Sequence, residues 1–423
     1  MLLEEYTTLF HRFFQGYYPI SLHAHASDAL HPTTIASLLI NTGATSPLVL
    51  HSPTLAPRPD EKPEETGQRV RQFALDLLGW NETHVREPKF VYEVRGYGAG
   101  YGPLAHASKE WEINAIAAGP KPVLVNIRTA TKESLDNLLA EAKAQGCIAA
   151  LIDLVSTEDG LILPPERLGM LKESCARHKL LLIVDETMTA IRCGAPFTFQ
   201  RSEYAAQEPH LQPDLVIFGK GLGVSGIALN FNGALIKNLG YVETPDMKQT
   251  ILYYRALVSR PIGLTTLIEA YGTLRKAEAQ NWPARSVQIG ETIRGILYEL
   301  EPQTREPGVI RGLAAMIALD KKYVTRFGIM GAIRRRSPIV RWLPSLSAGY
   351  ADRGLLMENV FGSQSRKHRQ TLSAEADRAG FAPLWCFLCG IQASSQDWCR
   401  ECFLSYCNNE VCVKKFGEHE HVG

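Results

Sequence analysis

The chain has 423 residues, 45% of them hydrophobic and 21% charged, which is enough for two or three domains with a large core. Its formal net charge of +1 gives no overall attraction to nucleic acid or to an anionic membrane. No run approaches the eighteen apolar residues of a membrane span, and the first residues are acidic where a signal peptide is basic. We therefore expect a cytoplasmic protein without a transmembrane helix.

The N-terminal part predicts short helices and long loops. An apolar pattern over Glu4–Phe14 predicts a helix, and a short apolar strand follows it. Residues 31–43 predict a second helix, with a proline near its first turn and a glycine at its end. Residues 53–66 are rich in proline and charge, which indicates a loop. Residues 94–103 are rich in glycine but lack the spacing of a nucleotide-binding motif, so a flexible loop is expected there.

The middle of the chain alternates amphipathic helices with continuous apolar strands. Strands that are apolar throughout, separated by helices, are typical of a parallel sheet that is covered on both faces. In chain order, the predicted elements are a helix at Ser134–Gln145, a strand at Cys147–Val155, a helix at Pro165–His178, and strands at Leu180–Val184 and Asp214–Phe218.

The later part predicts a long helical stretch over Leu264–Glu301 and then a smaller α+β region. That region includes Val309–Leu319 and a candidate strand at Leu355–Phe361. From about Leu384 the chain becomes rich in cysteine and poor in aliphatic residues. We therefore predict three domains: a large α/β domain over 1–265, a connecting helix and small domain over 266–380, and a cysteine-rich tail over 381–423.

Three of the predicted strands run into polar residues, namely Asp153, Asp185 and, after Gly219, Lys220. Ligands of open α/β sheets bind at the carboxyl ends of strands. A lysine amine can form a Schiff base with the aldehyde of pyridoxal phosphate (PLP), and a carboxylate can keep the ring nitrogen protonated. A single acid or lysine at a strand end is usually a solvated loop residue. The three in this order favour a PLP site, where glycines around Lys220 would let the backbone approach a flat cofactor.

Two segments resemble class III aminotransferases. Residues 181–194, Leu-Leu-Ile-Val-Asp-Glu-Thr-Met-Thr-Ala-Ile-Arg-Cys-Gly, resemble the Asp-Glu-Val-Met-Thr-Gly-Phe-Arg segment, in the form found in glutamate-1-semialdehyde aminomutases. Residues 213–226, Pro-Asp-Leu-Val-Ile-Phe-Gly-Lys-Gly-Leu-Gly-Val-Ser-Gly, resemble the Schiff-base lysine segment. More weakly, residues 25–29 resemble the phosphate-binding turn, and residues 308–316 resemble the start of the small C-terminal domain.

The resemblance implies a fold-type-I PLP enzyme. Such a chain has a large doubly wound, mostly parallel sheet domain and a smaller α+β C-terminal domain, and it forms a homodimer with shared active sites. The implied activity is aminotransferase or aminomutase chemistry between a small-molecule amino donor and a carbonyl acceptor. Lys220 would form the Schiff base and transfer protons, and Asp185 would hold the pyridinium. The implied cofactor-binding residues are Ala26, Ser27, Asp153, Asp185, Thr187 and Lys220.

Several positions depart from the family's pattern. Only some two dozen residues precede Ser27, fewer than the family carries, and Ala26 replaces a glycine in the phosphate turn. Thr54 falls where an aromatic stacks on the ring, Ala256 falls where a threonine reaches the partner's phosphate, and Arg341 is a loose match for the substrate arginine. Each lost contact to the phosphate removes about 1–3 kcal/mol. The alternative hypothesis is therefore a non-catalytic PLP-fold protein that acts as a binding module through its tail.

The tail holds six of the nine cysteines. In a chain without a signal peptide, clustered cysteines indicate metal before disulfides, and two Cys-x-x-Cys pairs are typical of zinc. Eight ligands would complete two structural zinc sites, in an order resembling MYND or B-box fingers, which bind protein partners. The alternative is a free-thiol tail. The predicted metal ligands are Cys386, Cys389, Cys399, Cys402, Cys407, Cys412, His419 and His421. Nucleic-acid binding is not expected, because the short basic runs indicate solvated faces.

Overall fold

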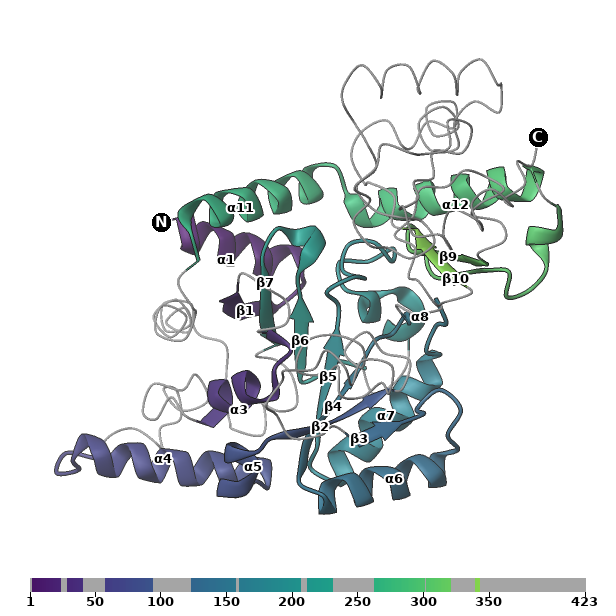
Figure 1. Ribbon diagram of the computed structural model, residues 1–423. Helices are drawn as coiled ribbons and strands as arrows, with labels where there is room; N and C mark the ends of the chain where they lie inside the picture. Colours follow the sequence, from purple (N-terminus) through teal and green to yellow (C-terminus); the bar gives the residue numbers. More distant parts are fainter. Residues whose placement is uncertain are drawn as a thin grey trace, which may run out of the picture. The chain divides into compact units, whose positions relative to one another are not determined.

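The computed structural model describes residues 2–23, 29–40, 58–93, 123–156, 160–206, 211–230, 262–300, 302–320 and 339–342 (Figure 1). The chain divides into two compact units. The first consists of Met1–Thr157 with Ile162–Ala284, and the second consists of Glu158–Leu161 with Arg285–Gly423. Every residue of the candidate site described below belongs to the first unit.

The first unit is built on a seven-stranded sheet with the order β1-β7-β6-β5-β4-β2-β3 (Figure 1). Within the described strands of this sheet, β7 is antiparallel to its neighbours β1 and β6, and the remaining pairs are parallel. The predicted mostly parallel sheet is therefore confirmed. The strands are β1 Tyr17–His23, β2 Lys89–Glu93, β3 Val123–Val125, β4 Cys147–Ile152, β5 Leu181–Asp185, β6 Leu215–Phe218 and β7 Ser225–Asn230.

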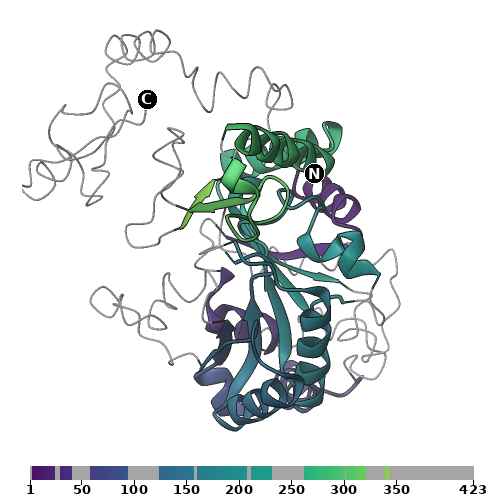
Figure 2. The same cartoon turned by 90° about the vertical axis from the view of Figure 1, so that its right-hand side faces the viewer.

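Helices cover both faces of this sheet. One face packs on α3 and α4 through a single apolar cluster, and Figure 2 shows the purple α3 on one side of the strands and the blue-green α7 on the other. Burial on both faces explains why β4 and β6 are apolar at every position and why β5 is apolar up to Asp185, its last residue. The helices are α1 Leu2–Phe13, α3 Pro32–Ile40, α4 Pro63–Leu78, α5 Glu82–Arg86, α6 Lys132–Ala144, α7 Pro165–Arg177, α8 Ser202–Ala205 and α11 Leu264–Ala279.

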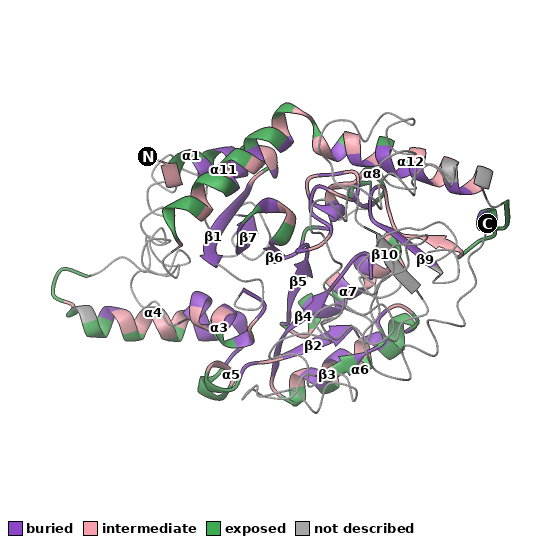
Figure 3. Cartoon of the chain, turned by 45° about the horizontal axis from the view of Figure 1, so that its top comes forward, coloured by how far each residue is buried: buried purple, intermediate pink, exposed green. Residues whose placement is uncertain are grey.

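Local sequence signals set the ends of these helices. Thr131 caps α6, because its side-chain oxygen accepts a hydrogen bond from the Ser134 amide at 3.1 Å. Helix α4 ends at Gly79, whose φ of 63° is the left-handed conformation typical of a helix C-cap. Figure 3 shows that β1, β4, β5, β6 and β7 are buried, whereas α4 and α6 keep an exposed face. None of the helices in the described part of the chain is long and apolar enough to cross a membrane.

The second unit contains most of α12 Trp282–Leu300, the turn η6 Pro302–Arg305, and a three-stranded antiparallel sheet. Its strands are β8 Ile310–Arg311, β9 Ile317–Asp320 and β10 Ile339–Trp342, in the order β10-β9-β8. Arg294 of α12 donates to the carbonyl oxygens of Gly312 and Ala314 at 3.0 and 2.9 Å, which fixes the β8–β9 turn. The predicted α+β character of Val309–Leu319 is thus confirmed.

Other predictions fail at particular positions. Residues 53–66 are not all loop, because α4 begins at Pro63, and proline is favoured in the first turn of a helix. The predicted helix at Leu264–Glu301 is two helices, α11 and α12, separated at Asn281 with φ 46°. The glycine-rich loop at 94–103 and the candidate strand at 355–361 lie outside the described residues.

Candidate active site

Three neighbouring strands bring the predicted polar residues to one edge of the sheet. Strands β4, β5 and β6 are parallel neighbours, and Ile152 pairs with Val184 in the register of β4 and β5. Asp153 follows β4, Asp185 ends β5, and Lys220 lies two residues beyond β6. The structure therefore brings these three residues to the carboxyl edge, as the sequence predicts.

Asp185 is a buried carboxylate with one oxygen left unpaired. Its side chain is 3% exposed, and its Oδ1 accepts a hydrogen bond from the Thr187 amide at 2.9 Å. Its Oδ2 is fully enclosed and receives no hydrogen bond from the described part of the chain. Burial raises the pKa of Asp185, while donation from Thr187 and the positive charge of Lys220 act in the opposite direction. Such a group is stabilised only by a further N–H donor or cation.

Lys220 begins a short 3-10 turn, Lys220–Leu222, directly after β6. Its φ of 45° is in the left-handed region, which is uncommon and costly for a residue with a side chain. The side chain is exposed, and its Nζ lies 2.8 Å from Sδ of Met188. A strained backbone therefore presents a lysine amine at the carboxyl edge of the sheet.

The turn after β5 is held by Glu186. This residue is fully buried and accepts hydrogen bonds from the Thr198 amide at 2.7 Å, the Thr198 hydroxyl at 2.9 Å and the Thr189 hydroxyl. The turn itself is strained, because Ile191 has φ 61°, an unusual value for a β-branched residue. The Glu186 carboxyl group therefore ties a tight turn to the segment that follows it.

Burial raises the pKa of Glu186 from its ordinary 4.5 to about 7. Between these values the folded state binds more protons than the unfolded state, so the free energy of unfolding falls as the pH rises from 4.5 to 7. A pKa difference of this size corresponds to about 3 kcal/mol. We expect Glu186→Gln to remove this part of the pH dependence in urea unfolding curves between pH 5 and 8. Glu133→Gln, on the exposed start of α6, is the control, and an unchanged pH profile in Glu186→Gln would contradict the assignment.

Asp153 is 3% exposed, and its backbone oxygen accepts a hydrogen bond from Nη2 of Arg128 at 2.7 Å. Nε and Nη1 of Arg128 are enclosed and have no hydrogen-bond partner within the described ranges. This arginine brings a positive charge to the end of β4. Sequence reasoning missed Arg128, because this residue follows the short strand β3 and belongs to no recognisable motif. Only the folded sheet places it near Asp153.

The glycines beside Lys220 have a different role from the predicted one. Gly223 has φ 79°, and a Cβ there would lie 3.2 Å from the Cα of Ala270 in α11. A Cβ on Gly226 would lie 2.3 Å from the backbone oxygen of Ser21 in β1. Real Cβ atoms do not approach backbone as closely as at Gly226, so that position requires glycine, whereas at Gly223 the positive φ and the tight contact together favour glycine. Protein backbone, rather than a cofactor, makes the close approach at these two positions.

Most of the remaining predicted site residues lie in parts of the chain that the structure does not describe. Ala26, Ser27, Thr54 and Ala256 lie outside the described residues, as do all eight predicted metal ligands of the tail. Arg341 lies in β10 of the second unit. Within the described ranges, no group of three or more His, Cys, Asp or Glu residues could hold a metal ion.

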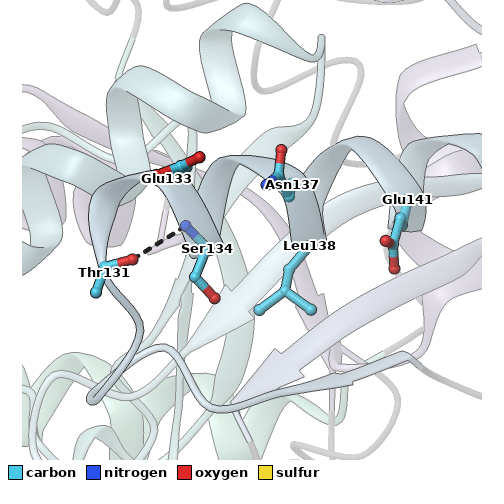
Figure 4. Close-up of a pocket in the computed structure, with 6 residues that line it drawn as sticks. All are labelled: Thr131, Glu133, Ser134, Asn137, Leu138 and Glu141. Atoms are coloured by element: carbon cyan, nitrogen blue, oxygen red, sulfur yellow. Dashed lines mark hydrogen bonds between the residues drawn. The ribbon is translucent and has the colours of Figure 1, made fainter.

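A surface hollow of about 390 Å³ lies along α6 and its N-cap (Figure 4). Two glutamates contribute to its lining, which disfavours an anionic ligand such as a phosphate. None of the predicted site residues lines it, so the carboxyl edge of β4, β5 and β6 remains the candidate site. The lining residues are Thr131, Glu133, Ser134, Asn137, Leu138 and Glu141.

Comparison with known proteins agrees with this geometry. The model of the aminotransferase class-III family matches residues 105–346, which is more than half of the chain. The chain is 25% identical over 227 residues to ornithine aminotransferase of Staphylococcus epidermidis, covering 53% of this chain and 48% of that protein. It is 28% identical over 180 residues to alanine/serine racemase of Pyrococcus horikoshii, covering 41% and 33% respectively. The chain thus matches half or less of the length of these relatives.

Among solved structures, lysine aminotransferase from M. tuberculosis superposes with a TM-score of 0.55 at 15% identity, covering 84% of this chain and 78% of that one. At this identity the likeness shows the fold, which is that of fold-type-I transferases. From the family match over residues 105–346, the chain belongs to the class-III aminotransferase family.

Proposed function

We propose that the protein is a PLP-dependent aminotransferase that moves an amino group between a small amino compound and a carbonyl acceptor. The observation that carries this proposal is the enclosed Oδ2 of Asp185, which receives no hydrogen bond from the described residues and lies on the same sheet edge as the Lys220 amine. A protonated pyridine nitrogen supplies both the N–H and the positive charge that this oxygen needs. The residues present therefore fit PLP.

When bound, PLP supplies an aldehyde for the lysine amine and a ring that accepts electrons from the substrate carbon. Lys220 would supply the amine that holds the aldehyde and the base that moves a proton during amino transfer. Asp185 would hold the pyridinium nitrogen through Oδ2, while its Oδ1 stays bonded to the Thr187 amide. Thr187 would line the ring site, and Asp153 would support it from the neighbouring strand.

The proposal extends to the parts of the protein outside the described residues. Ser27 and the backbone of Ala26 would bind the phosphate, and the active protein would be a homodimer, as the family resemblance implies. The division into domains over 1–265, 266–380 and 381–423 is part of the same proposal. Family membership supports the enzyme hypothesis over the alternative of a non-catalytic binding module.

Amino transfer tests this function directly. Purified protein with added PLP would be incubated with 2-oxoglutarate and one amino donor at a time. The donors are ornithine, 5-aminovalerate, alanine and serine, the compounds in the names of its relatives. We expect glutamate to form with at least one donor, at a rate that depends on PLP. If the protein binds PLP but exchanges no amino group with any of these donors, the result would contradict the aminotransferase proposal and support the hypothesis of a non-catalytic binding module.

We also propose that the cysteine-rich tail binds about two zinc ions, independently of PLP. The support is the sequence alone, with two Cys-x-x-Cys pairs among eight ligand residues. Metal analysis of the full chain, purified under reducing conditions without chelator, should find about two zinc ions per chain. The double variant Cys386→Ser/Cys389→Ser should lose about one of them. Less than one zinc per wild-type chain would refute the proposal.

A further inference from the structure

The side chain of Met188 contacts the amine on which the proposed function depends. Its Sδ lies 2.8 Å from Nζ of Lys220, and the methionine is partly exposed. We propose that Met188 is a positioning residue, whose thioether holds the Lys220 amine at the carboxyl end of β5 for attack on the cofactor's aldehyde. This inference rests on the proposed function and adds to it a residue that acts through Lys220.

The backbone of Met188 is held by the residues on either side of it. The Thr187 amide is bonded to Oδ1 of Asp185 at 2.9 Å, and the Thr189 hydroxyl donates to the buried Glu186 carboxyl group. Both bonds lie within the turn that follows β5. The turn therefore holds the Met188 backbone and the Asp185 carboxylate together, and from this backbone the Met188 side chain reaches the Lys220 amine.

The chemistry of the thioether suits this role. Lys220 is exposed and has four rotatable side-chain bonds, so an unrestrained amine would spend much of its time directed into water. A thioether is a weak, polarisable acceptor, which can orient an amine without binding it as tightly as a carboxylate would. Because reaction rates depend steeply on the orientation of the attacking atom, this contact should speed the attachment of Lys220 to the cofactor.

The test measures the attachment of PLP to cofactor-free protein. Stopped-flow absorbance would follow its rate, and borohydride reduction with peptide mapping would confirm that Lys220 carries the label. Met188→Leu keeps an apolar side chain without the acceptor, and Met188→Gln keeps a similar length with a stronger acceptor. Met170→Leu, at a partly exposed position in α7, is the matched control for the same substitution.

We expect Met188→Leu to slow attachment by about threefold to tenfold, the size of one lost weak hydrogen bond. Met170→Leu should stay within about twofold of wild type, and Met188→Gln should be faster than Met188→Leu. Thermal unfolding of the cofactor-free proteins shows whether each variant folds. If Met188→Leu does not fold, the rate of Met188→Gln is compared with that of the wild type instead. A Met188→Leu rate equal to wild type would overturn the inference, whereas an unlabelled Lys220 in the wild type would instead overturn the proposed function.

Discussion

Lys220→Ala should abolish amino transfer, with turnover lower by about four orders of magnitude or more. The variant loses the amine that attaches to the aldehyde and the group that moves the proton, and general acid–base catalysis alone contributes about 10²–10⁴-fold. The measurement is single-turnover conversion of a donor that the wild type accepts, with PLP at saturating concentration. Because the Lys220 side chain is exposed and alanine has the same Cβ at this positive φ, the variant should fold like the wild type.

Lys132→Ala is the matched control for this variant. Lys132 is also an exposed lysine, which forms an ion pair with Glu173 at 2.9 Å between α6 and α7. Surface pairs of this kind contribute about 0–1 kcal/mol to stability, so this variant should keep wild-type turnover. Turnover in Lys220→Ala within tenfold of the wild type would show that another lysine carries the reaction.

Asp185→Asn should lower turnover by about 10²–10⁴-fold while leaving the cofactor-free protein at least as stable as the wild type at pH 7. The asparagine keeps an oxygen for the Thr187 amide but removes the charge that would hold the pyridinium. Since burial raises the pKa of Asp185, its ionised form is costly in the folded protein, and the uncharged amide avoids that cost. Loss of activity without loss of stability is typical of a functional residue.

Two measurements on Asp185→Asn separate the possible roles of this residue. Urea unfolding without PLP gives the stability, and single-turnover kinetics with PLP gives the rate. A variant that unfolds more easily than the wild type would indicate a structural carboxylate. Near wild-type turnover would show that Asp185 does not face the ring nitrogen.

The candidate site was predictable where chemistry follows a buried strand. The apolar runs before Asp153, Asp185 and Lys220 predicted neighbouring parallel strands, and the structure confirms that these residues share one edge. Contacts between distant segments were not predictable. The bonds of Glu186 with Thr198, and that of Arg128 with Asp153, join positions between which no sequence periodicity exists.

The missed elements have local reasons as well. Strand β7 contains Gly226, and a glycine in the sequence favours a turn or loop. In the structure this position is a glycine because β1 approaches it too closely for any side chain. The helical pattern over Leu264–Glu301 continues across Asn281, whose left-handed φ separates α11 from α12. The start of α4 was not predicted because its first residue is Pro63, and proline indicates a loop as well as the first turn of a helix.

The identity of the lysine that carries PLP tests the central claim most directly. Purified wild-type protein would be incubated with PLP, reduced with borohydride, digested and mapped by mass spectrometry. The account predicts one pyridoxyl group per chain, on the peptide that contains Lys220. A label on other lysines with none on Lys220, at PLP concentrations that saturate the protein's absorbance change, would contradict it.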